Sequence, residues 1–445
     1  VHDHLVHFYH LPWLDWIDMA SAIGADPTAA GRLVAETSER DADPGELFIV
    51  RKRLKEFVET GQLGFLENAY FLGGNPAYRL SPEENLILSA HYLEGLRIQL
   101  KLGRAMALLA GKNPHAQTMV VGGVTCYDAL RPEVIAQFRD LWRESLEFVE
   151  NAMWPDVIRL AKAFPEAAGY GRTSNFFDFA DFYDPATGKD PFFRSGVLWG
   201  NDFDTVEDLD IGEIDEHVAR SWYVGEEARK PYDGVTDPMY TSYEDKEKYS
   251  WSKAPRYKGE PMETGPLARR AIAYARKEPD TRTLTDGFLQ ATGLTPEQLF
   301  STMGRTGCRV IETVLLTRRM QGWIDETEQR IKAGESDIYT SWTMPDEARG
   351  VGTCCVTRGG LSHWIRIRHK RIENFQMVVP STWNLGPRCA EGKISPAEES
   401  LMGCPCPDPE RPVEILRTIH SFDPCIACSV HLTDASGSRG SFRVR

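Results

Sequence analysis

The chain has 445 residues, a length that allows one large core or two to three domains. Hydrophobic residues make up 42% of the sequence and charged residues 26%, which is ordinary for a globular protein. The formal net charge of −14 argues against nucleic acid as the main partner, because a phosphate ligand selects a basic surface. No apolar stretch is long enough to predict a transmembrane helix.

The chain begins inside a helical pattern. Leu5, Phe8 and Trp13 recur at roughly helical spacing, and no capping residue or leader precedes them. We therefore expect that natural sequence preceding Val1 is missing.

Three long segments predict helices, at residues 84–111, 131–164 and 305–333. Each carries a wide apolar stripe, and helices of this kind usually pack as a bundle. Residues 169–266 differ, because they are dense in Gly, Pro, Asp and aromatic residues. This composition predicts short strands and ordered loops.

A β-hairpin is predicted within residues 362–381. Polar and apolar residues alternate on both sides of a charged turn at His369, Lys370 and Arg371, and Pro380 closes the pattern. The predicted fold class is α+β and predominantly α. It has a long-helix bundle core, a small β-hairpin and irregular α/β regions in one compact unit.

The nine cysteines are concentrated near the C-terminus. Seven follow residue 350, namely Cys354, Cys355, Cys389, Cys404, Cys406, Cys425 and Cys428. An odd count in a chain this long does not fit a disulfide scaffold. The distribution indicates thiol or metal chemistry at this end of the chain.

The segment SFDPCIACSVH, residues 421–431, predicts the start of a short helix. Asp423 suits the N-cap and Pro424 the first helical position, so Cys425 and Cys428 would lie on one side of the first turns. The positive end of the helix dipole would then favour two thiolates.

Four interpretations of this cysteine pair remain open from the residues alone. A zinc site would need Cys404 and Cys406 as a second pair. A dithiol redox motif would need a neighbouring parallel sheet, and haem attachment would need histidine where Ser429 stands. Two buried thiols without a metal are the fourth interpretation.

In its surroundings, D-P-C-x-x-C-x-x-H resembles the signature of the large, catalytic subunit of nickel–iron hydrogenases. Other blocks resemble the family in order and spacing: HDHLVHFYH (2–10), PHAQTMVVGGVT (114–125), KYSW (248–251), PMETGPLA (261–268), RGGLSHW (358–364), VVPSTWN (378–384) and PVEILRTIHSF (412–422). The resemblance runs essentially end to end, and is greatest to periplasmic uptake enzymes of sulfate-reducing bacteria.

The resemblance implies a nickel held by four cysteines, two of which bridge to an iron that carries CO and cyanide. Cys425 would be a terminal nickel ligand and Cys428 a bridging one, which suits the softness of thiolate. His431 and the backbone carbonyl of Met377 would bind a magnesium ion. The implied reaction is the reversible oxidation of hydrogen to protons and electrons, in the direction of uptake.

The resemblance also implies a pocket for the iron's diatomic ligands. Ser381 and Arg358 would donate hydrogen bonds to the cyanides. Leu361, Val379 and Pro380 would form the apolar wall around the CO.

Arg358, Asp3 and Asp423 resemble the canopy over the open metal position. Two carboxylates beside one guanidinium hold it in place and offset its charge. The expected catalytic residues are therefore Arg358, Asp423, Asp3 and Cys425, with the Cys425 thiolate as first proton acceptor and Arg358 polarising hydrogen.

The sequence departs from the family pattern in three respects. It lacks the N-terminal R-x-C-G-x-C and the glutamate upstream of it, so we expect those ligands in preceding sequence. Thr357 stands where the family usually has proline, which predicts a perturbed canopy. Residues 432–445 extend past His431 and resemble a propeptide, so the expected catalytic domain is 1–431 and the tail is removed after nickel loading.

The resemblance implies several partners. These are an iron–sulfur small subunit that brings the export signal, nickel-loading factors, a maturation endopeptidase and molecular hydrogen. The expected location is periplasmic, or membrane-associated and facing the periplasm. The alternatives are a hydrogen sensor, an inactive or split subunit, the metal-free quinone-site subunit of respiratory complex I and a zinc-stabilised helical protein.

Overall fold

The computed structural model describes residues 1–37, 43–61, 75–184, 187–425, 429–433 and 439–443. Contacts between Cα atoms divide the chain into two compact units. The first comprises Val1–Phe164 and Val310–Thr343, and the second comprises Pro165–Arg309 and Met344–Arg445.

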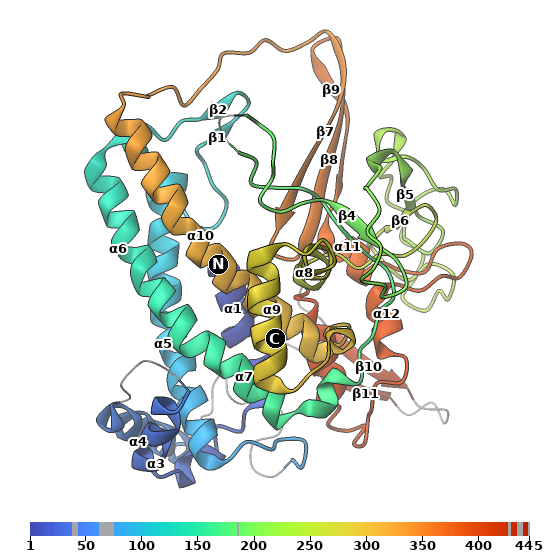
Figure 1. Cartoon of the computed structure of the whole chain (residues 1–445). Coiled ribbons are helices and arrows are strands. Elements are labelled where there is room, and N and C mark those ends of the chain that lie inside the picture. The colour runs from blue at the N-terminus through green and yellow to red at the C-terminus, as the bar shows by residue number, and fades with distance from the viewer. Residues whose placement is uncertain (38–42, 62–74, 185–186, 426–428, 434–438, 444–445) are drawn as a thin grey trace. The chain divides into compact units, whose positions relative to one another are not determined.

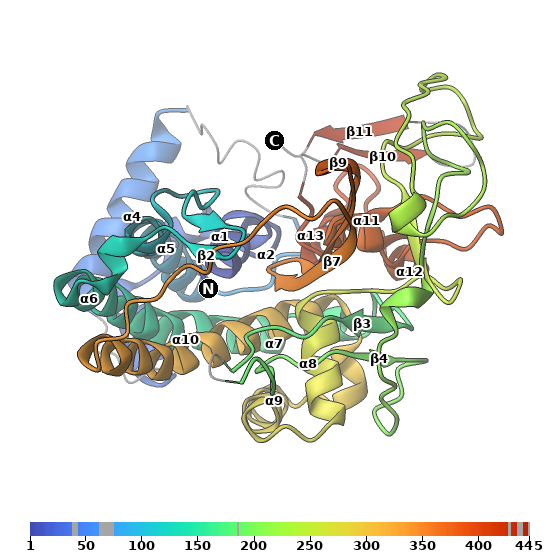
Figure 2. The ribbon, with the colours of Figure 1, turned by 90° about the horizontal axis from the view of Figure 1, so that it is seen from above.

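The first unit is built from helices. They are α1 (His2–His10), α2 (Trp13–Trp16), α3 (Pro27–Ala35), α4 (Pro44–Glu59), α5 (Pro82–Ala110), α6 (Pro132–Phe148), α7 (Trp154–Ala163) and most of α10 (Thr302–Lys332). A small hairpin joins β1 (Met119–Val120) to β2 (Gly123–Val124). Helices α5 and α6 lie side by side (Figures 1 and 2).

The long helices agree with the sequence predictions. Helix α5 begins with a capping box in which Ser81 and Glu84 satisfy each other's backbone N–H, and it ends at Gly111 with a φ of 76°. Helix α10 matches the prediction for 305–333. Its buried Ile324 packs with Trp142 of α6.

The predicted helix 131–164 forms one helical stretch in three parts. A wide π-helical turn, Val149–Met153, separates α6 from α7 and ends two residues before Pro155. Proline has no N–H to donate and its ring crowds the preceding turn, so a locally widened turn accommodates it inside the stretch.

The second unit mixes strands with short helices. Its strands are β3 (Phe176–Asp178), β4 (Gly196–Leu198), β5 (Ile214–His217), β6 (Ala254–Tyr257), β7 (Glu347–Val356), β8 (Gly359–Arg368), β9 (Arg371–Val378), β10 (Ser429–Thr433) and β11 (Arg439–Arg443). Its helices are α8 (Pro266–Ala275), α9 (Pro279–Thr292), the start of α10, α11 (Pro380–Leu385), α12 (Pro396–Leu401) and α13 (Val413–Ser421). The pairs β3–β4 and β5–β6 confirm the short strands expected in 169–266.

The predicted β-hairpin is confirmed and belongs to a larger sheet. Strands β8 and β9 pair antiparallel around His369 and Lys370, whose φ angles of 50° and 57° suit a two-residue hairpin turn. Strand β7 pairs with the other edge of β8 (Figure 1). One face of this sheet packs through Trp364 into a buried core that includes Trp383.

The predicted helix start at Pro424 is wrong. Asp423 has a φ of 56° rather than the extended conformation of an N-cap, and neither Pro424 nor Cys425 is helical. The chain is in strand β10 by Ser429. The predicted effect of a helix dipole on the Cys425 thiol is therefore wrong as well.

The observed mixture of helices and small sheets confirms the α+β class. The packing of the long helices as one bundle stays a prediction. Within the described ranges, none of the helices combines the length and the hydropathy needed to span a bilayer.

Candidate metal centre

Arg358 lies in a two-residue turn. The pairing of β7 with β8 ends at Val356 and Gly359, which leaves Thr357 and Arg358 as the central turn residues. Gly359 has a φ of 141°, and a Cβ there would come within 2.5 Å of Thr264 Cγ2. Glycine is therefore needed for the turn to lie this close to Thr264.

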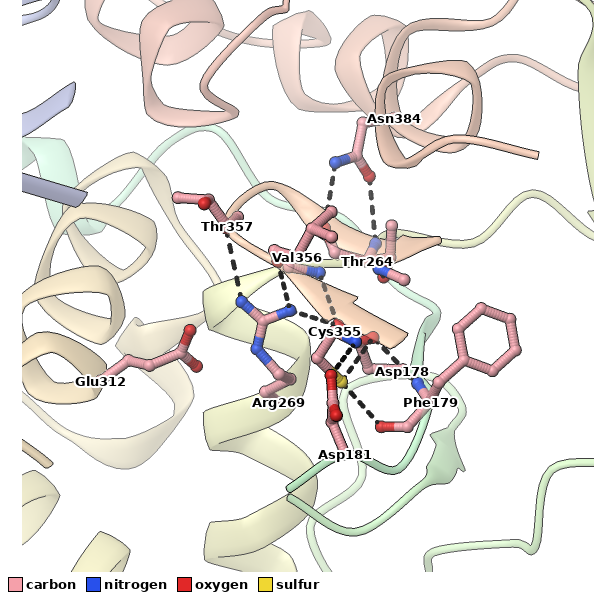
Figure 3. Close-up of polar contacts among 12 residues, drawn as sticks. Asp178, Phe179, Asp181, Thr264, Arg269, Glu312, Cys355, Val356, Thr357 and Asn384 are labelled. Atoms are coloured by element: carbon pink, nitrogen blue, oxygen red, sulfur yellow. Dashed lines mark hydrogen bonds and ion pairs between the residues drawn. The ribbon is translucent and has the colours of Figure 1, made fainter. Parts of the chain in front are cut away.

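A buried ion pair holds this turn in place through hydrogen bonds to its backbone (Figure 3). Arg269 Nη1 lies 2.9 Å from Asp178 Oδ2, and both side chains are almost inaccessible to solvent. The same guanidinium donates to the carbonyls of Val356 at 3.2 Å and Thr357 at 3.4 Å. Because these acceptors precede Arg358 directly, the pair sets the position of the turn.

Thr264 joins the turn to helix α11. Its hydroxyl accepts a hydrogen bond from the Gly360 N–H at 2.7 Å. Its backbone N–H donates to Asn384 Oδ1 at 3.0 Å, and its carbonyl accepts from Asn384 Nδ2 at 2.9 Å. Strand β8 and helix α11 also contact each other directly. The RGG and PSTWN blocks of the sequence are therefore tied together.

Arg358 and Asp423 contact each other, as the sequence analysis expected. Arg358 Nη2 lies 3.2 Å from Asp423 Oδ1, and Nε donates to the Asp423 backbone carbonyl at 3.0 Å. Asp423 is 2% exposed, whereas the Arg358 side chain is 32% exposed. Arg358 also lines a cavity of about 10 Å³, which is about one water molecule in size, with Asn384 and Ser421 among its other lining residues.

Cys425 lies two residues after Asp423 and is an exposed, free thiol. Thiolate is a soft ligand that suits nickel, so this part of the chain fits one ligand of a thiolate-bound nickel–iron group. Cys428 lies outside the described residues, and so does the side chain of His431.

The residues expected around the iron lie on two contacting elements. Leu361 is on β8, Val379 follows β9, and Pro380 and Ser381 begin α11. Pro380 is buried and the other three are partly buried. Met377, whose backbone carbonyl is the expected magnesium ligand, lies on β9 opposite His363 and is 55% exposed.

Asp3 lies on helix α1 of the first unit. Its carboxylate contacts His2 Nδ1 at 2.9 Å and is about half exposed. Its expected place in the canopy stays a prediction.

Several other cysteines are partly buried. Burial raises the pKa of Cys354, and the carboxylates of Asp181 and Asp178 raise it further. The Cys355 thiol donates to the Phe179 carbonyl at 3.0 Å. Cys404 Sγ lies 3.5 Å from Thr418 Oγ1, and burial is the first cause of the raised pKa of Cys404.

The sequence analysis missed the buried ion pairs of the second unit. Besides Arg269 with Asp178, Arg305 Nη2 lies 2.8 Å from Glu263 Oε2, and both of these side chains are buried. One sequence feature could have indicated such a pair, namely a charged residue inside an apolar block. Glu263 in PMETGPLA is an example. The partners are 42 and 91 residues apart in sequence, and nothing local identifies which cation meets which carboxylate.

The family model described as nickel-dependent hydrogenase matches residues 1–431. This chain belongs to the nickel-dependent hydrogenase family.

Relatives of this hydrogenase-family chain match over almost its entire length. The quinone-reactive Ni/Fe-hydrogenase large chain of Wolinella succinogenes is 39% identical, over 98% of this chain and 80% of the relative. The uptake hydrogenase large subunit of Bradyrhizobium diazoefficiens is 40% identical, over 98% and 79%. The reduced Ni-Fe-Se hydrogenase of Desulfovibrio vulgaris Hildenborough superposes with a TM-score of 0.73 at 27% identity, covering 95% of this chain and 78% of that one.

Proposed function

We propose that this chain is the catalytic subunit of a hydrogenase, which oxidises molecular hydrogen reversibly to protons and electrons and works mainly in the direction of uptake. The observation that carries this proposal is the similarity to hydrogenase large chains over 98% of the sequence. Arg358 contacts Asp423, and Asp423 lies two residues before Cys425. This contact supports placing the site next to Arg358.

Cys425 and Cys428 would be two of the four cysteine ligands of the nickel–iron centre. When bound, this group supplies the site at which hydrogen is activated. Ser381 and Arg358 would donate to cyanide ligands of the iron, because hydrogen-bond donors stabilise a ligand that carries negative charge. Leu361, Val379 and Pro380 belong to the apolar wall of the CO pocket, as inferred from their place in the resembling blocks.

Arg358, Asp423 and Cys425 would act on the proton. An arginine side chain stays protonated at neutral pH, so it is a poor base. We assign the first proton to Cys425 Sγ, while the Arg358 cation polarises hydrogen. Asp423 holds the guanidinium at two of its nitrogens, and Asp3 would be the second carboxylate of the canopy.

Further parts of the proposal follow from the family. His431 and the Met377 carbonyl would bind magnesium. An iron–sulfur small subunit would take the electrons and export the complex to the periplasm or to a membrane surface facing it. Nickel-loading factors would fill the site, and an endopeptidase would then remove residues 432–445.

The test is to purify the complex from its host and measure hydrogen-dependent dye reduction together with nickel and iron content. We expect both metals and activity in the unaltered protein. Cys425→Ser and Cys428→Ser should lose nickel and activity, whereas Cys126→Ser should keep them, because Cys126 lies in the first unit near the Leu108 carbonyl. Full nickel content in Cys425→Ser would contradict the assignment.

A further inference from the structure

A histidine, a cysteine and a glutamate meet in the second unit outside the proposed nickel–iron centre. His217 ends strand β5, while Cys389 and Glu391 lie in the loop between α11 and α12. Their potential ligand atoms all lie within 4.8 Å of one another. The separation of His217 Nδ1 from Glu391 Oε2 is 3.9 Å.

A tight turn holds Cys389 and Glu391 together. The Gly392 N–H donates to the Cys389 carbonyl at 3.0 Å, and Gly392 has a φ of 79°, which glycine adopts at little cost. The Cys389 N–H donates to the Lys393 carbonyl at 3.3 Å. The thiol and the carboxylate are therefore presented from one short, fixed segment.

The protonation states of two of these groups suit metal binding. Burial, followed by the nearby Arg256 cation, lowers the pKa of His217, so its imidazole is neutral at pH 7 and has a free lone pair. A hydrogen bond from the Cys389 thiol, followed by one from its own N–H, lowers the pKa of Glu391. The carboxylate is thus ionised, and metal binding would displace the thiol proton to solvent.

Arg256 is the feature that opposes a cation here, and its position limits the effect. Its side chain is fully buried, and Nη1 and Nη2 donate to the backbone carbonyls of Pro255, Pro387 and Lys393 at 2.8, 3.3 and 2.9 Å. The guanidinium also interacts with Cys389. With the thiol ionised, two anionic ligands offset the double charge of a divalent ion.

We propose that His217, Cys389 and Glu391 bind a divalent ion of the zinc class at a site separate from the nickel–iron centre. Nitrogen, sulfur and oxygen donors together select zinc over magnesium or calcium, which prefer oxygen alone. Zinc bonds of about 2.0–2.3 Å place tetrahedral ligands about 3.3–3.8 Å apart. The Glu391 side chain is 60% exposed and so has room to rotate toward the ion, and water would take the fourth position.

The ion would connect the end of β5 to the loop after α11. No residue of the proposed centre is a ligand, so loss of this site should leave nickel and iron in place. This separates failure of the zinc proposal from failure of the proposed function.

The experiment measures zinc by mass spectrometry in the purified complex, after dialysis against micromolar zinc and then metal-free buffer. We expect about one zinc per chain in the unaltered protein. Cys389→Ser and Glu391→Gln should each weaken zinc binding about tenfold or more, with nickel and iron content unchanged. Glu391 is an exposed residue, so its variant should fold. Cys126→Ser is the matched control and should keep its zinc.

Cobalt(II) provides a second readout, because a cobalt–thiolate bond gives a near-ultraviolet charge-transfer band. This band should form in Glu391→Gln at higher cobalt concentration and be absent in Cys389→Ser. Zinc below about 0.1 per chain in the unaltered protein would overturn the proposal, and so would zinc retained at full affinity in both variants. Glu391→Gln keeps the test valid if the buried cysteine variant fails to fold.

Discussion

Arg358 is held by two different atoms of a single partner. Its Nη2 contacts the Asp423 carboxylate and its Nε donates to the Asp423 carbonyl, so the guanidinium plane is fixed as well as its charge. Asp423 can present both oxygens because its φ of 56° turns the chain after α13. The same backbone conformation prevents the helix that the sequence predicted.

We expect Arg358→Lys to lower hydrogen oxidation by about 10- to 100-fold, because an ammonium reaches one of the two acceptors and loses the planar geometry. Nickel and iron content should stay unchanged, which separates a catalytic effect from failed assembly. Arg349→Lys, on an exposed part of β7, is the control. Near-normal turnover in Arg358→Lys would remove any specific role for the guanidinium.

Thr357 occupies the first central position of the turn, where proline is favoured. Neither Thr357 nor Arg358 has a positive φ, which is compatible with proline at the first central position. We expect Thr357→Pro to shift the CN and CO infrared bands, because it removes a hydroxyl from the residue that precedes Arg358, the expected cyanide donor. Unchanged bands would show that Thr357 does not perturb the pocket.

At the scale of elements, the sequence predicted what local patterns encode. The helices α5 and α10 and the β8–β9 hairpin follow from periodicity, and His369 and Lys370 were correctly expected in the turn. Strand β7 was missed because Gly350 and Gly352 interrupt its alternation of apolar and polar residues. Arg358 and Asp423 are 65 residues apart, so no local pattern predicts their contact. It was expected only because of the family resemblance.

The buried pair of Arg269 and Asp178 connects strand β3, helix α8 and the turn between β7 and β8, and no local sequence pattern predicts it. We expect Asp178→Asn to lower the free energy of unfolding by about 3–5 kcal/mol, because it leaves a buried cation without its counter-charge. Urea denaturation measures this change. The control is Asp208→Asn, whose fully exposed carboxylate lies 3.5 Å from Arg276 and should have no measurable effect.

A double variant tests whether the pair acts as a unit. If Asp178→Asn and Arg269→Met are combined, the loss should be smaller than the sum of the two single losses, because no unpaired charge remains. Strict additivity would contradict a direct coupling between these side chains.

At the scale of the whole molecule, the C-terminal tail is joined to the segment expected to carry metal ligands. His431 lies in β10, which pairs with the tail strand β11, and His431 is directly opposite Ser441. Cleavage after His431 would therefore cut within β10 and remove its partner strand. The proposed removal of residues 432–445 would thus change the backbone pairing of the retained end.

We expect mass spectrometry of the active complex to show a large subunit that ends at His431. A variant that cannot be cleaved should retain β11. It should show little activity, since the residues up to His431 in β10 stay paired with β11. Full activity with the tail attached would mean that these residues have no role in maturation.

The two-residue turn at Thr357 and Arg358 also determines which face of the sheet each later side chain of β8 occupies. Strand β8 continues from it in strict alternation, so the count of residues from Arg358 decides that Trp364 faces the core and Leu361 the opposite side. One inserted residue would reverse every later side chain of β8 unless a bulge absorbed it. Insertions and deletions between Arg358 and Trp364 should therefore be far less tolerated than substitutions, which makes the length of this segment a constraint as strict as the identity of the arginine.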